Sequence, residues 1–436
     1  MTAAAATYRQ VLALSGPLLP VISFLGRLPT AMCQLGSVLL VAETSGSLTT
    51  AGLVGGALAA GQTVAGPLTG RLADRHGQRP VVLVCCWLNA LAVAALVAAA
   101  LARMATPPLA LIGLLAGASV PQVGPLARTR LVALAHRAAS DDRVVSAALS
   151  FEGTLDEVSF VLGPALVGVA ASVAHPAVAL ALAAVLLAVC GSAFALHPTA
   201  VAAGPAADRA RKAPRPPRAA RVRMPRAVHA MRLSTALQGA MFGACQAGIA
   251  ALTERLHQPA QAGLVYAAMG VMSAVAGLSL ALVPARIGLP ARWRAAAAAL
   301  IVLSAPLLLV RSMGALYLVV VVLGVAFAPH LITLFGLTER LVPATRLAES
   351  MAFLTSAVVG GQALALALSG RLADAYGPSA AFAVAVGAAV LILAVALLTR
   401  AGSRPTAPVR TARPDQTAAA DRTPTASRRK GVGPLT

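Results

Sequence analysis

Residues 61–77 read GQTVAGPLTGRLADRHG, and residues 361–377 read GQALALALSGRLADAYG. Aligned without a gap, the two stretches agree at ten of seventeen positions and share the run Gly-Arg-Leu-Ala-Asp. In the first copy this run is followed by Arg75 and Arg79, and the second copy has no arginine at the matching positions. A pattern that occurs twice in one chain indicates internal duplication, which constrains how the segments between the copies are arranged.

The composition predicts an all-α integral membrane protein. Of the 436 residues, 58% are hydrophobic and 11% are charged. Ordinary soluble domains have about 25% charged residues, so this chain could not cover a water-exposed surface. Uncharged runs such as 81–101 and 177–196 are long enough for a helix to cross about 30 Å of hydrocarbon. A β-barrel would instead show short alternating segments.

Apolar stretches separated by short loops predict twelve transmembrane helices in two six-helix bundles. The spans are expected at 15–41, 48–70, 80–102, 109–130, 145–170, 177–197, 229–252, 261–284, 295–311, 313–337, 347–369 and 378–399. The segment 198–228 is rich in arginine and proline, which predicts a basic cytoplasmic linker between bundles at 1–197 and 229–400. The segment 401–436 is rich in Thr, Pro, Ala and Arg, which predicts a disordered cytoplasmic tail.

The positive charge, +21 overall, predicts the orientation of the chain in a cell membrane. Most arginines lie in the even-numbered loops, the linker and the tail, so both termini are expected in the cytoplasm of a multi-pass plasma-membrane protein. Contact with anionic lipid explains these arginines. Nucleic acid is not an expected partner, because aromatic residues make up only 3% of the chain.

The two repeated loops are expected on opposite faces of the membrane, because nine predicted spans separate them. We therefore predict three-helix repeats that are alternately inverted, an arrangement typical of secondary transporters. Positive charge disfavours translocation, which explains why only the copy expected inside keeps its two arginines.

Residues 70–80, GRLADRHGQRP, resemble the loop signature between the second and third helices of the major facilitator superfamily. The resemblance implies a monomeric permease that works by alternating access. It also implies that Asp74 meets the start of the eleventh helix, near 346–350, and latches the cytoplasmic side. A carboxylate at a helix N-terminus is favourable by roughly 0.3–1 kcal/mol. The residues assigned to this conformational latch are Gly70, Asp74, Arg75, Gly77 and Arg79.

The fifth span carries FVLGPALVG at 160–168, which resembles a shortened signature of the drug:proton antiporter branch. Gly163, Pro164 and Gly168 are expected to kink the helix and to allow close helix contact. This partial match favours efflux over uptake.

Charged residues within the predicted spans are candidates for proton coupling, because a carboxylate in the bilayer must pair, protonate or face water. The candidates are Glu152, Asp156, Glu157 and Arg27. Arg27 is expected to pair with Asp156 or Glu157, and the alternative role is an ion pair that only fixes the bundle. Arg128 and Arg130 are expected to partner Asp74 or Glu152, or to anchor at lipid headgroups.

Polar side chains on the first, fourth, seventh and tenth spans, which line the cavity in this family, are the substrate-contact candidates. They are Gln34, Gln122, Gln238, Gln246 and His330. Pro121 and Pro329 directly precede two of them, which predicts kinked helices that present a polar group at mid-depth.

Motifs for catalysis and cofactor binding are missing from the sequence. There is no phosphate-binding Gly-x-x-x-x-Gly-Lys-Ser/Thr loop, no zinc-ligand spacing and no nucleophile elbow, so no enzyme activity, cofactor or metal is expected. The sequence predicts a permease that exports a small organic molecule in exchange for protons. Two alternatives stay open: a proton-coupled importer, and a non-transporting receptor or scaffold with the same fold.

Overall fold

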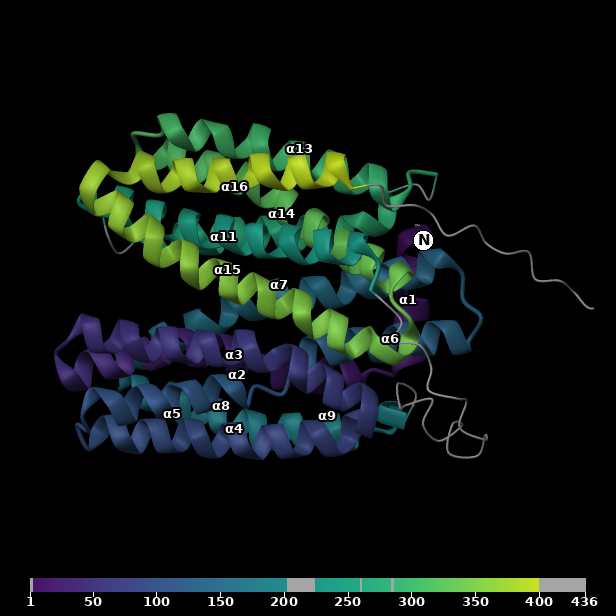
Figure 1. Cartoon of the computed structure of the whole chain (residues 1–436), viewed down its shortest axis with the longest axis horizontal. Helices are drawn as coiled ribbons and strands as arrows, with labels where there is room; N and C mark the ends of the chain where they lie inside the picture. The colour runs from purple at the N-terminus through teal and green to yellow at the C-terminus, as the bar shows by residue number, and fades with distance from the viewer. Residues whose placement is uncertain (1–2, 202–223, 259–260, 284–285, 400–436) are drawn as a thin grey trace, which may run out of the picture. The chain divides into compact units, whose positions relative to one another are not determined.

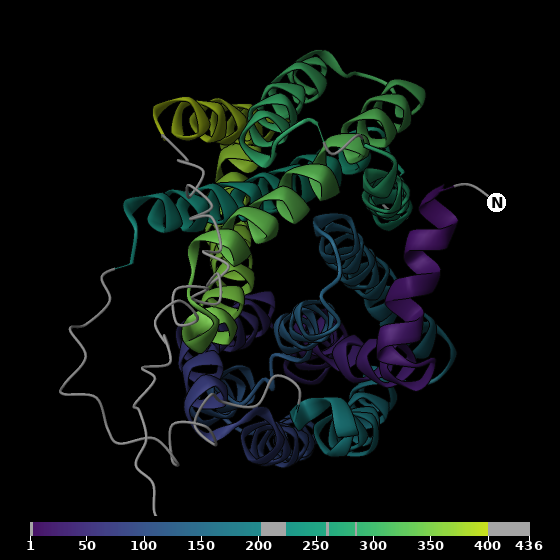
Figure 2. The same ribbon diagram turned by 90° about the vertical axis from the view of Figure 1, so that its right-hand side faces the viewer.

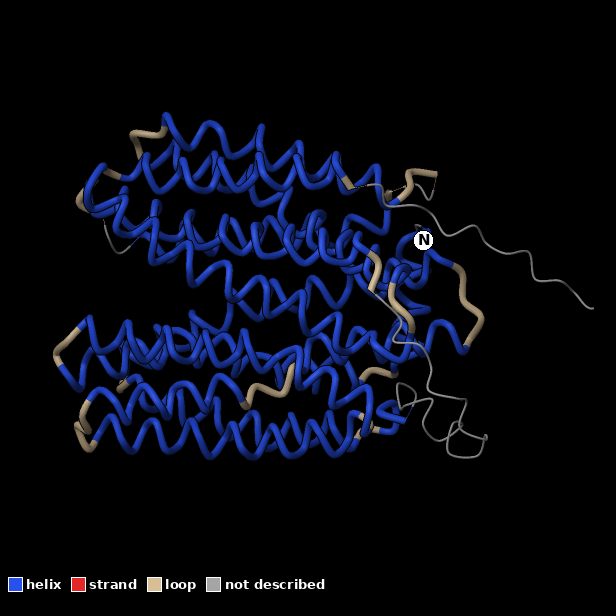
Figure 3. The backbone as a smooth tube through the Cα atoms, viewed as in Figure 1, coloured by secondary structure: helices blue, strands red, loops and turns tan. Residues whose placement is uncertain are grey.

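Helices and short loops make up the whole of the chain described by the structure, a computed structural model (Figure 3). It describes residues 3–201, 224–258, 261–283 and 286–399, and no strand occurs among them. All of these described residues belong to one compact unit. Most of the predicted linker and all of the predicted tail lie outside the described residues.

The first half of the chain forms a series of helices that begins before the first predicted span. They are α1 (Ala3–Ser15), α2 (Leu18–Ser45), α3 (Leu48–His76), α4 (Gln78–Leu101), α5 (Thr106–Ala118), α6 (Val123–Arg137), α7 (Asp142–Val173), α8 (Pro176–Leu186) and α9 (Ser192–Leu196). A π-helical turn, η1 (Leu187–Gly191), joins α8 to α9, and a 3-10 turn, η2 (Pro198–Val201), follows.

The second half continues with long helices joined by 3-10 turns. They are α11 (Arg226–Arg255), α12 (Ala262–Ser279), η4 (Leu280–Leu282), α13 (Leu289–Ser304), η5 (Ala305–Leu309), α14 (Met313–Leu341), η6 (Ala344–Arg346), α15 (Leu347–Tyr376) and α16 (Pro378–Leu398).

Each of the twelve predicted spans coincides with a helix or a broken pair of helices. By length and hydropathy, ten segments of the described chain qualify as membrane spans. The other two predicted spans correspond to α3 and α11, which have 29 and 30 residues but are not apolar enough or carry too much charge to be among those ten. At 1.5 Å per residue each is about 44 Å long, so both are long enough to cross. The count of twelve crossings therefore depends on α3 and α11 and stays a prediction.

The sequence did not predict α1. The chain turns after it at Gly16, whose φ of 68° suits glycine, and α2 then starts at Leu18. In Figure 2, α1 lies across one end of the helices, and it packs against α6 and α7. Its Tyr8 hydroxyl donates a hydrogen bond of 2.7 Å to the Leu278 carbonyl oxygen, near the end of α12.

The predicted span at 109–130 is wrong as a single helix, because the chain breaks between α5 and α6. Pro121 has no N–H and its ring opposes a continuous helix, and Gln122 adopts a left-handed conformation with φ of 55°. A kink is also expected at Pro329, which lies inside α14; the helix continues through this proline, and the kink itself stays a prediction. The Ser273 hydroxyl oxygen accepts the Ala328 N–H just before it, at 3.1 Å.

Helices of each half pack mainly with one another, and the two groups meet through two long contacts (Figure 1). In one contact α3 packs along α15, and in the other α7 packs along α12. Within the second group, α11 and α15 approach so closely that a Cβ at Gly239 or Gly361 would collide with a backbone carbonyl. We call α2–α9 the N-terminal group and α11–α16 the C-terminal group.

Candidate functional site

Asp74, near the end of α3, caps the start of α15. Its carboxylate oxygens accept the backbone N–H groups of Ala348, at 3.1 Å, and Glu349, at 2.8 Å. One turn earlier in α3, Gly70 provides the room for this contact, because a Cβ there would lie 2.5 Å from the Ala348 carbonyl oxygen. The carboxylate thus satisfies N–H groups that have no partner within their own helix. The expected contact with the start of this helix is present.

The other three latch candidates lie around the turn between α3 and α4. Gly77 has φ of 89° and ψ of 154°, a conformation essentially restricted to glycine, and Gly377 in the second copy repeats it with 87° and 173°. Arg79 donates to the Leu196 carbonyl oxygen at 3.2 Å. Arg75 is exposed on the last turn of α3.

The second repeated copy occupies the opposite end of α15. Because α15 begins at the Asp74 contact and has 30 residues, its final turn lies about 45 Å away. There Asp374 is exposed, and Gly370 has open space around the position of a Cβ. We call the end of the bundle where α3 ends and α15 begins the Asp74 end.

One further ion pair and one contact between a carboxylate and an imidazole join the helix groups at the Asp74 end. Arg340, near the end of α14, contacts Asp142 at the start of α7 at 2.8 Å. Its neighbour Glu339 lies 3.4 Å from His136, near the end of α6. Farther from this end, the Ser356 hydroxyl of α15 donates to the carbonyl oxygen of Gln62, in the middle of α3. Contacts between the groups are therefore dense at this end.

A cluster of four charged residues is buried in the N-terminal group. Arg27 of α2 is ion-paired with Glu152 and, at 2.7 Å, with Asp156, both of α7. Asp156 is also ion-paired with Arg128 of α6. The cluster is neutral in sum, with two guanidinium and two carboxylate groups. Burial without such pairing would cost several kcal/mol per ion.

The partners of Arg128 and Arg130 differ from those expected. Arg128 pairs with Asp156 rather than with Asp74 or Glu152, and its guanidinium lies 3.8 Å from the centre of the Phe335 ring on α14. Arg130 is fully buried and donates to Gln78 and to the Phe194 carbonyl oxygen. Neither is a lipid anchor. The sequence signal for Arg128 was a charge in an apolar helix, which requires a partner.

Glu157 is separate from this cluster. Among the described residues it belongs to no ion pair, and the Arg27 partner considered for it is taken by its two neighbours. Its side chain is hydrogen-bonded to Ser273 of α12, across the contact between the helix groups. Glu157 is therefore a carboxyl group that shares no ion pair in the described chain, although the Arg128 guanidinium is near enough to favour its charged form.

The two glycines of the kink motif in α7 differ in how closely they are packed. Gly163 packs against α2, where its Cβ would lie 2.7 Å from the Ala31 Cβ. Pro164 lies inside the helix, which continues to Val173. No atom lies within 4 Å of a Cβ added at Gly168, so close packing does not require this glycine.

Four of the five cavity candidates are hydrogen-bonded to other polar groups. The Gln34 amide donates to Gln62 at 3.3 Å, and the Gln246 amide oxygen accepts from Gln362 at 3.4 Å. His330 contacts Gln238 at 2.6 Å, and its second ring nitrogen is buried without a partner in the described chain. The remaining candidate, Gln122, is buried at the break between α5 and α6.

Gln62 and Gln362, which sequence reasoning missed, occupy the second position of the two repeated stretches. Their identity in both copies was the available signal.

Comparisons with solved structures agree with this architecture. The human organic anion transporter MFSD10 (TETRAN) has a TM-score of 0.62 and 21% identity, covering 89% of this chain and 99% of that chain. A bacterial homologue of the iron transporter ferroportin, in its outward-facing state, has a TM-score of 0.67 and 16% identity, covering 87% of this chain and 98% of that chain. The fucose:proton symporter of E. coli has a TM-score of 0.60 and 14% identity, covering 89% of this chain and 98% of that chain. At these identities the likeness shows the fold alone.

A family model matches most of the sequence. No curated protein matches the sequence significantly. Residues 13–345 match the model of the Major Facilitator Superfamily, which is most of the chain and includes the Asp74 loop, the α7 carboxylates and α11–α14. The chain therefore belongs to the major facilitator superfamily, a family of multi-pass membrane transporters.

Proposed function

We propose that this protein is a secondary active transporter that exports a small organic molecule in exchange for protons, by alternating access. Family membership supports a secondary transporter. The observation that carries the proton step is Glu157, a carboxyl group on a membrane helix with no ion pair among the described residues and a hydrogen bond to the opposite helix group.

Glu157 and Asp156 are neighbours but have different roles in this proposal. Asp156 contacts two guanidinium groups, so protonating it would leave two buried positive charges poorly balanced. Protonating Glu157 would break no ion pair and would remove a charge from the membrane interior, which is favourable. Glu157 thus carries the proton, and the cluster of Arg27, Arg128, Glu152 and Asp156 holds α2, α6 and α7 in place.

The hydrogen bond between Glu157 and Ser273 offers a way to couple protonation to movement. Ser273 lies on α12, and α7 and α12 form one of the two contacts between the helix groups. Ionised Glu157 accepts a hydrogen bond from the Ser273 hydroxyl, and its charge favours water between α7 and α12. Protonated Glu157 carries no charge, so it can remain in a dry, apolar contact between these helices. Protonation therefore changes the free energy of the α7–α12 contact, as alternating access requires.

The Asp74 end is the closed, cytoplasmic side in this proposal, and the opposite end is where the substrate leaves. The arginine distribution supports this orientation. The amide pairs Gln34–Gln62 and Gln246–Gln362, together with Gln122, Gln238 and His330, are the proposed substrate contacts. Amides can both donate and accept hydrogen bonds and carry no charge, which suits a neutral or weakly polar organic solute.

The test is accumulation of fluorescent lipophilic dyes in cells that lack their own efflux pumps. We expect the wild-type protein to lower dye accumulation and a protonophore to abolish that effect. The Glu157→Gln variant should reach the membrane but export no dye, whereas Glu254→Gln, a matched change at an exposed position at the end of α11, should behave as wild type.

Other results of the same assay would contradict this proposal. Higher accumulation that depends on the proton gradient would indicate an importer. Accumulation that changes with none of the dyes, in either direction, would favour a receptor or scaffold, and gradient-dependent export by Glu157→Gln would remove this residue from the proton step.

A further inference from the structure

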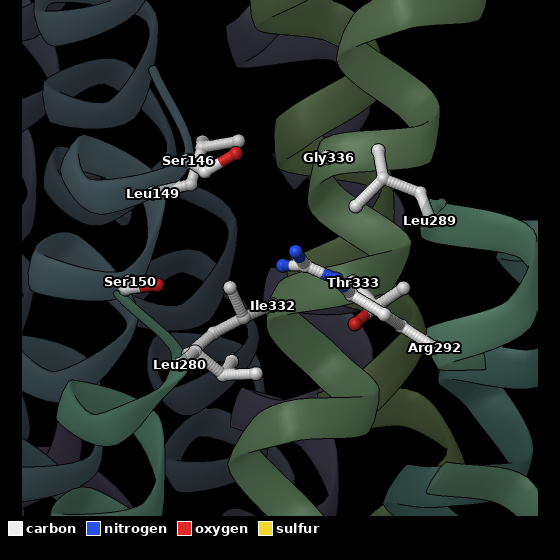
Figure 4. Close-up of a pocket in the computed structure, with 9 residues that line it drawn as sticks. All are labelled: Ser146, Leu149, Ser150, Leu280, Leu289, Arg292, Ile332, Thr333 and Gly336. Atoms are coloured by element: carbon white, nitrogen blue, oxygen red, sulfur yellow. The ribbon is translucent and has the colours of Figure 1, made fainter. Parts of the chain in front are cut away.

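A small pocket lies between the two helix groups near the Asp74 end. Figure 4 shows that three of its residues come from α7 and the others from the C-terminal group. The lining residues are Ser146, Leu149, Ser150, Leu280, Leu289, Arg292, Ile332, Thr333 and Gly336. Ser146 is the fifth residue of α7 and Arg292 the fourth of α13, so these two residues lie within the first two turns of their helices.

The polar groups of the pocket face one another across the boundary between the groups. The Arg292 guanidinium points toward α7, and the hydroxyl groups of Ser146 and Ser150 point toward it (Figure 4). Arg292 is held in this direction by the carbonyl oxygens of Ile287, at 2.9 Å, and Val283, at 3.2 Å.

Ser150 is unusual because its hydroxyl lines the pocket without a hydrogen bond of its own. The residue is only 2% exposed, and its side-chain oxygen has no hydrogen-bond partner in the described part of the chain. The Ser150 hydroxyl is not among the fully buried polar atoms that lack a partner, so it reaches the space of the pocket and is available there to a ligand or water.

The chemistry of these groups selects an anion. A guanidinium and two hydroxyl groups supply only donors to an oxyanion, and arginine binds phosphate with particular strength. The cavity itself measures about 20 Å³, room for about one water, so it accepts a single oxygen rather than a whole solute. Two of its polar residues lie near the starts of their helices, and basic pockets between membrane helices bind the headgroups of anionic lipids.

We propose that Arg292, Ser146 and Ser150 form a binding site for the phosphate group of an anionic membrane lipid. One phosphate oxygen occupies the pocket, while the rest of the headgroup stays outside it. Because Arg292 belongs to the C-terminal group and the serines to the N-terminal group, the bound phosphate links the two groups and stabilises the form closed at the Asp74 end.

The site is tested by the thermal unfolding midpoint of the full-length protein in detergent. The additives are dioleoyl phosphatidylcholine, dioleoyl phosphatidylglycerol and inorganic phosphate at the same phosphate concentration. We expect phosphatidylglycerol, and neither of the other two, to raise the midpoint. Arg292→Gln should lose most of that rise.

Arg294→Gln is the matched control, because the chain carries a net charge of +21 and attracts anionic lipid at many places. Arg294 lies one residue beyond Trp293 on the same helix, is exposed, and contacts Ala396 rather than the pocket. This variant should keep the full rise. The double variant Ser146→Ala/Ser150→Ala, which changes no charge, should lose part of it and gives the answer if Arg292→Gln does not fold.

Three outcomes would overturn the proposal. An equal rise in Arg292→Gln and Arg294→Gln would mean that the lipid acts through general charge. An equal rise of the midpoint with phosphatidylcholine would mean that the protein does not distinguish an anionic lipid from a zwitterionic one, so no site for anionic lipid exists. A rise with inorganic phosphate that Arg292→Gln abolishes would keep the phosphate site but overturn the lipid as its source.

Discussion

Asp74 accepts the backbone N–H of Glu349 at 2.8 Å, although the two residues are 275 positions apart in the chain. The contact joins the last turn of α3 to the first turn of α15, and so joins the two helix groups at one end. The contact depends on the negative charge of Asp74 at the N-terminus of α15, and on Gly70, one turn away, which allows α3 and α15 to approach closely.

Replacing Asp74 by asparagine should weaken closure at this end. The amide keeps an acceptor but loses the charge, which is worth roughly 0.3–1 kcal/mol at a helix N-terminus, or about a two- to fivefold change in the closed population. Dye export should fall while the amount of folded protein in the membrane stays constant. Asp374→Asn, the same change in the exposed second copy, is the control and should leave export unchanged; equal effects of the two variants would exclude a latch at Asp74.

Replacing Gly70 by valine should hold the Asp74 end open. Any Cβ at this position lies 2.5 Å from the Ala348 carbonyl oxygen, so α3 and α15 cannot both keep their places. A cysteine reagent should then reach a Ser356→Cys site that is almost fully buried in the wild-type structure. Gly370→Val is the control, because its surroundings are open. Labelling that stays equally slow in both variants would show that Gly70 does not set this approach.

Replacing Asp156 by asparagine should destabilise the protein far more than replacing Glu157 by glutamine. The first change leaves Arg27 and Arg128 without a shared carboxylate, and breaking a buried pair of this kind costs roughly 3–5 kcal/mol. The second change removes no ion pair. Thermal unfolding of the two purified variants tests this difference. Similar losses of stability would mean that the charge of Glu157 is balanced as well as that of Asp156.

Replacing Tyr8 by phenylalanine should remove the hydrogen bond that ties α1 to the end of α12. A net loss of about 1 kcal/mol is expected for one such bond. Burial raises the pKa of Tyr8 to about 12, so the neutral hydroxyl is favoured in the folded protein. The stabilisation is thus fully present below pH 10 and disappears only as the pH rises toward 12. The difference between variant and wild type should be the same in mildly acidic and mildly basic buffer; a difference that varies across this range would contradict the assignment.

The sequence predicted the helix positions well, because hydropathy and loop breakers are local signals. It did not predict α1, which packs on one end of the bundle instead of forming a long apolar run. Pro121 and Pro329 looked alike, yet one ends a helix and the other lies within one. The difference arises from tertiary contacts, including the Ser273 hydroxyl that accepts a neighbouring N–H, and spacing along the chain does not encode them.

The candidate site was predictable in its parts but not in its pairing. Charged residues are easily recognised within an apolar stretch of sequence, so the sequence identified Arg27, Glu152, Asp156 and Glu157 as candidates. Which of them pair depends on how α2, α6 and α7 are rotated, and the contact of Arg128 with Asp156 followed only from the structure. This pairing distinguishes the two adjacent carboxylates, because Asp156 has ion pairs and Glu157 has none in the described chain.

The most direct test of the account is the accessibility of its two repeated loops from outside the cell. Arg75→Cys and Ala375→Cys variants would be treated in intact cells with a membrane-impermeant maleimide. We expect that Ala375→Cys reacts at once and that Arg75→Cys reacts only after the cells are permeabilised. Reaction of both variants in intact cells, or of Arg75→Cys alone, would contradict the arrangement of the chain on which the proposed transport cycle depends.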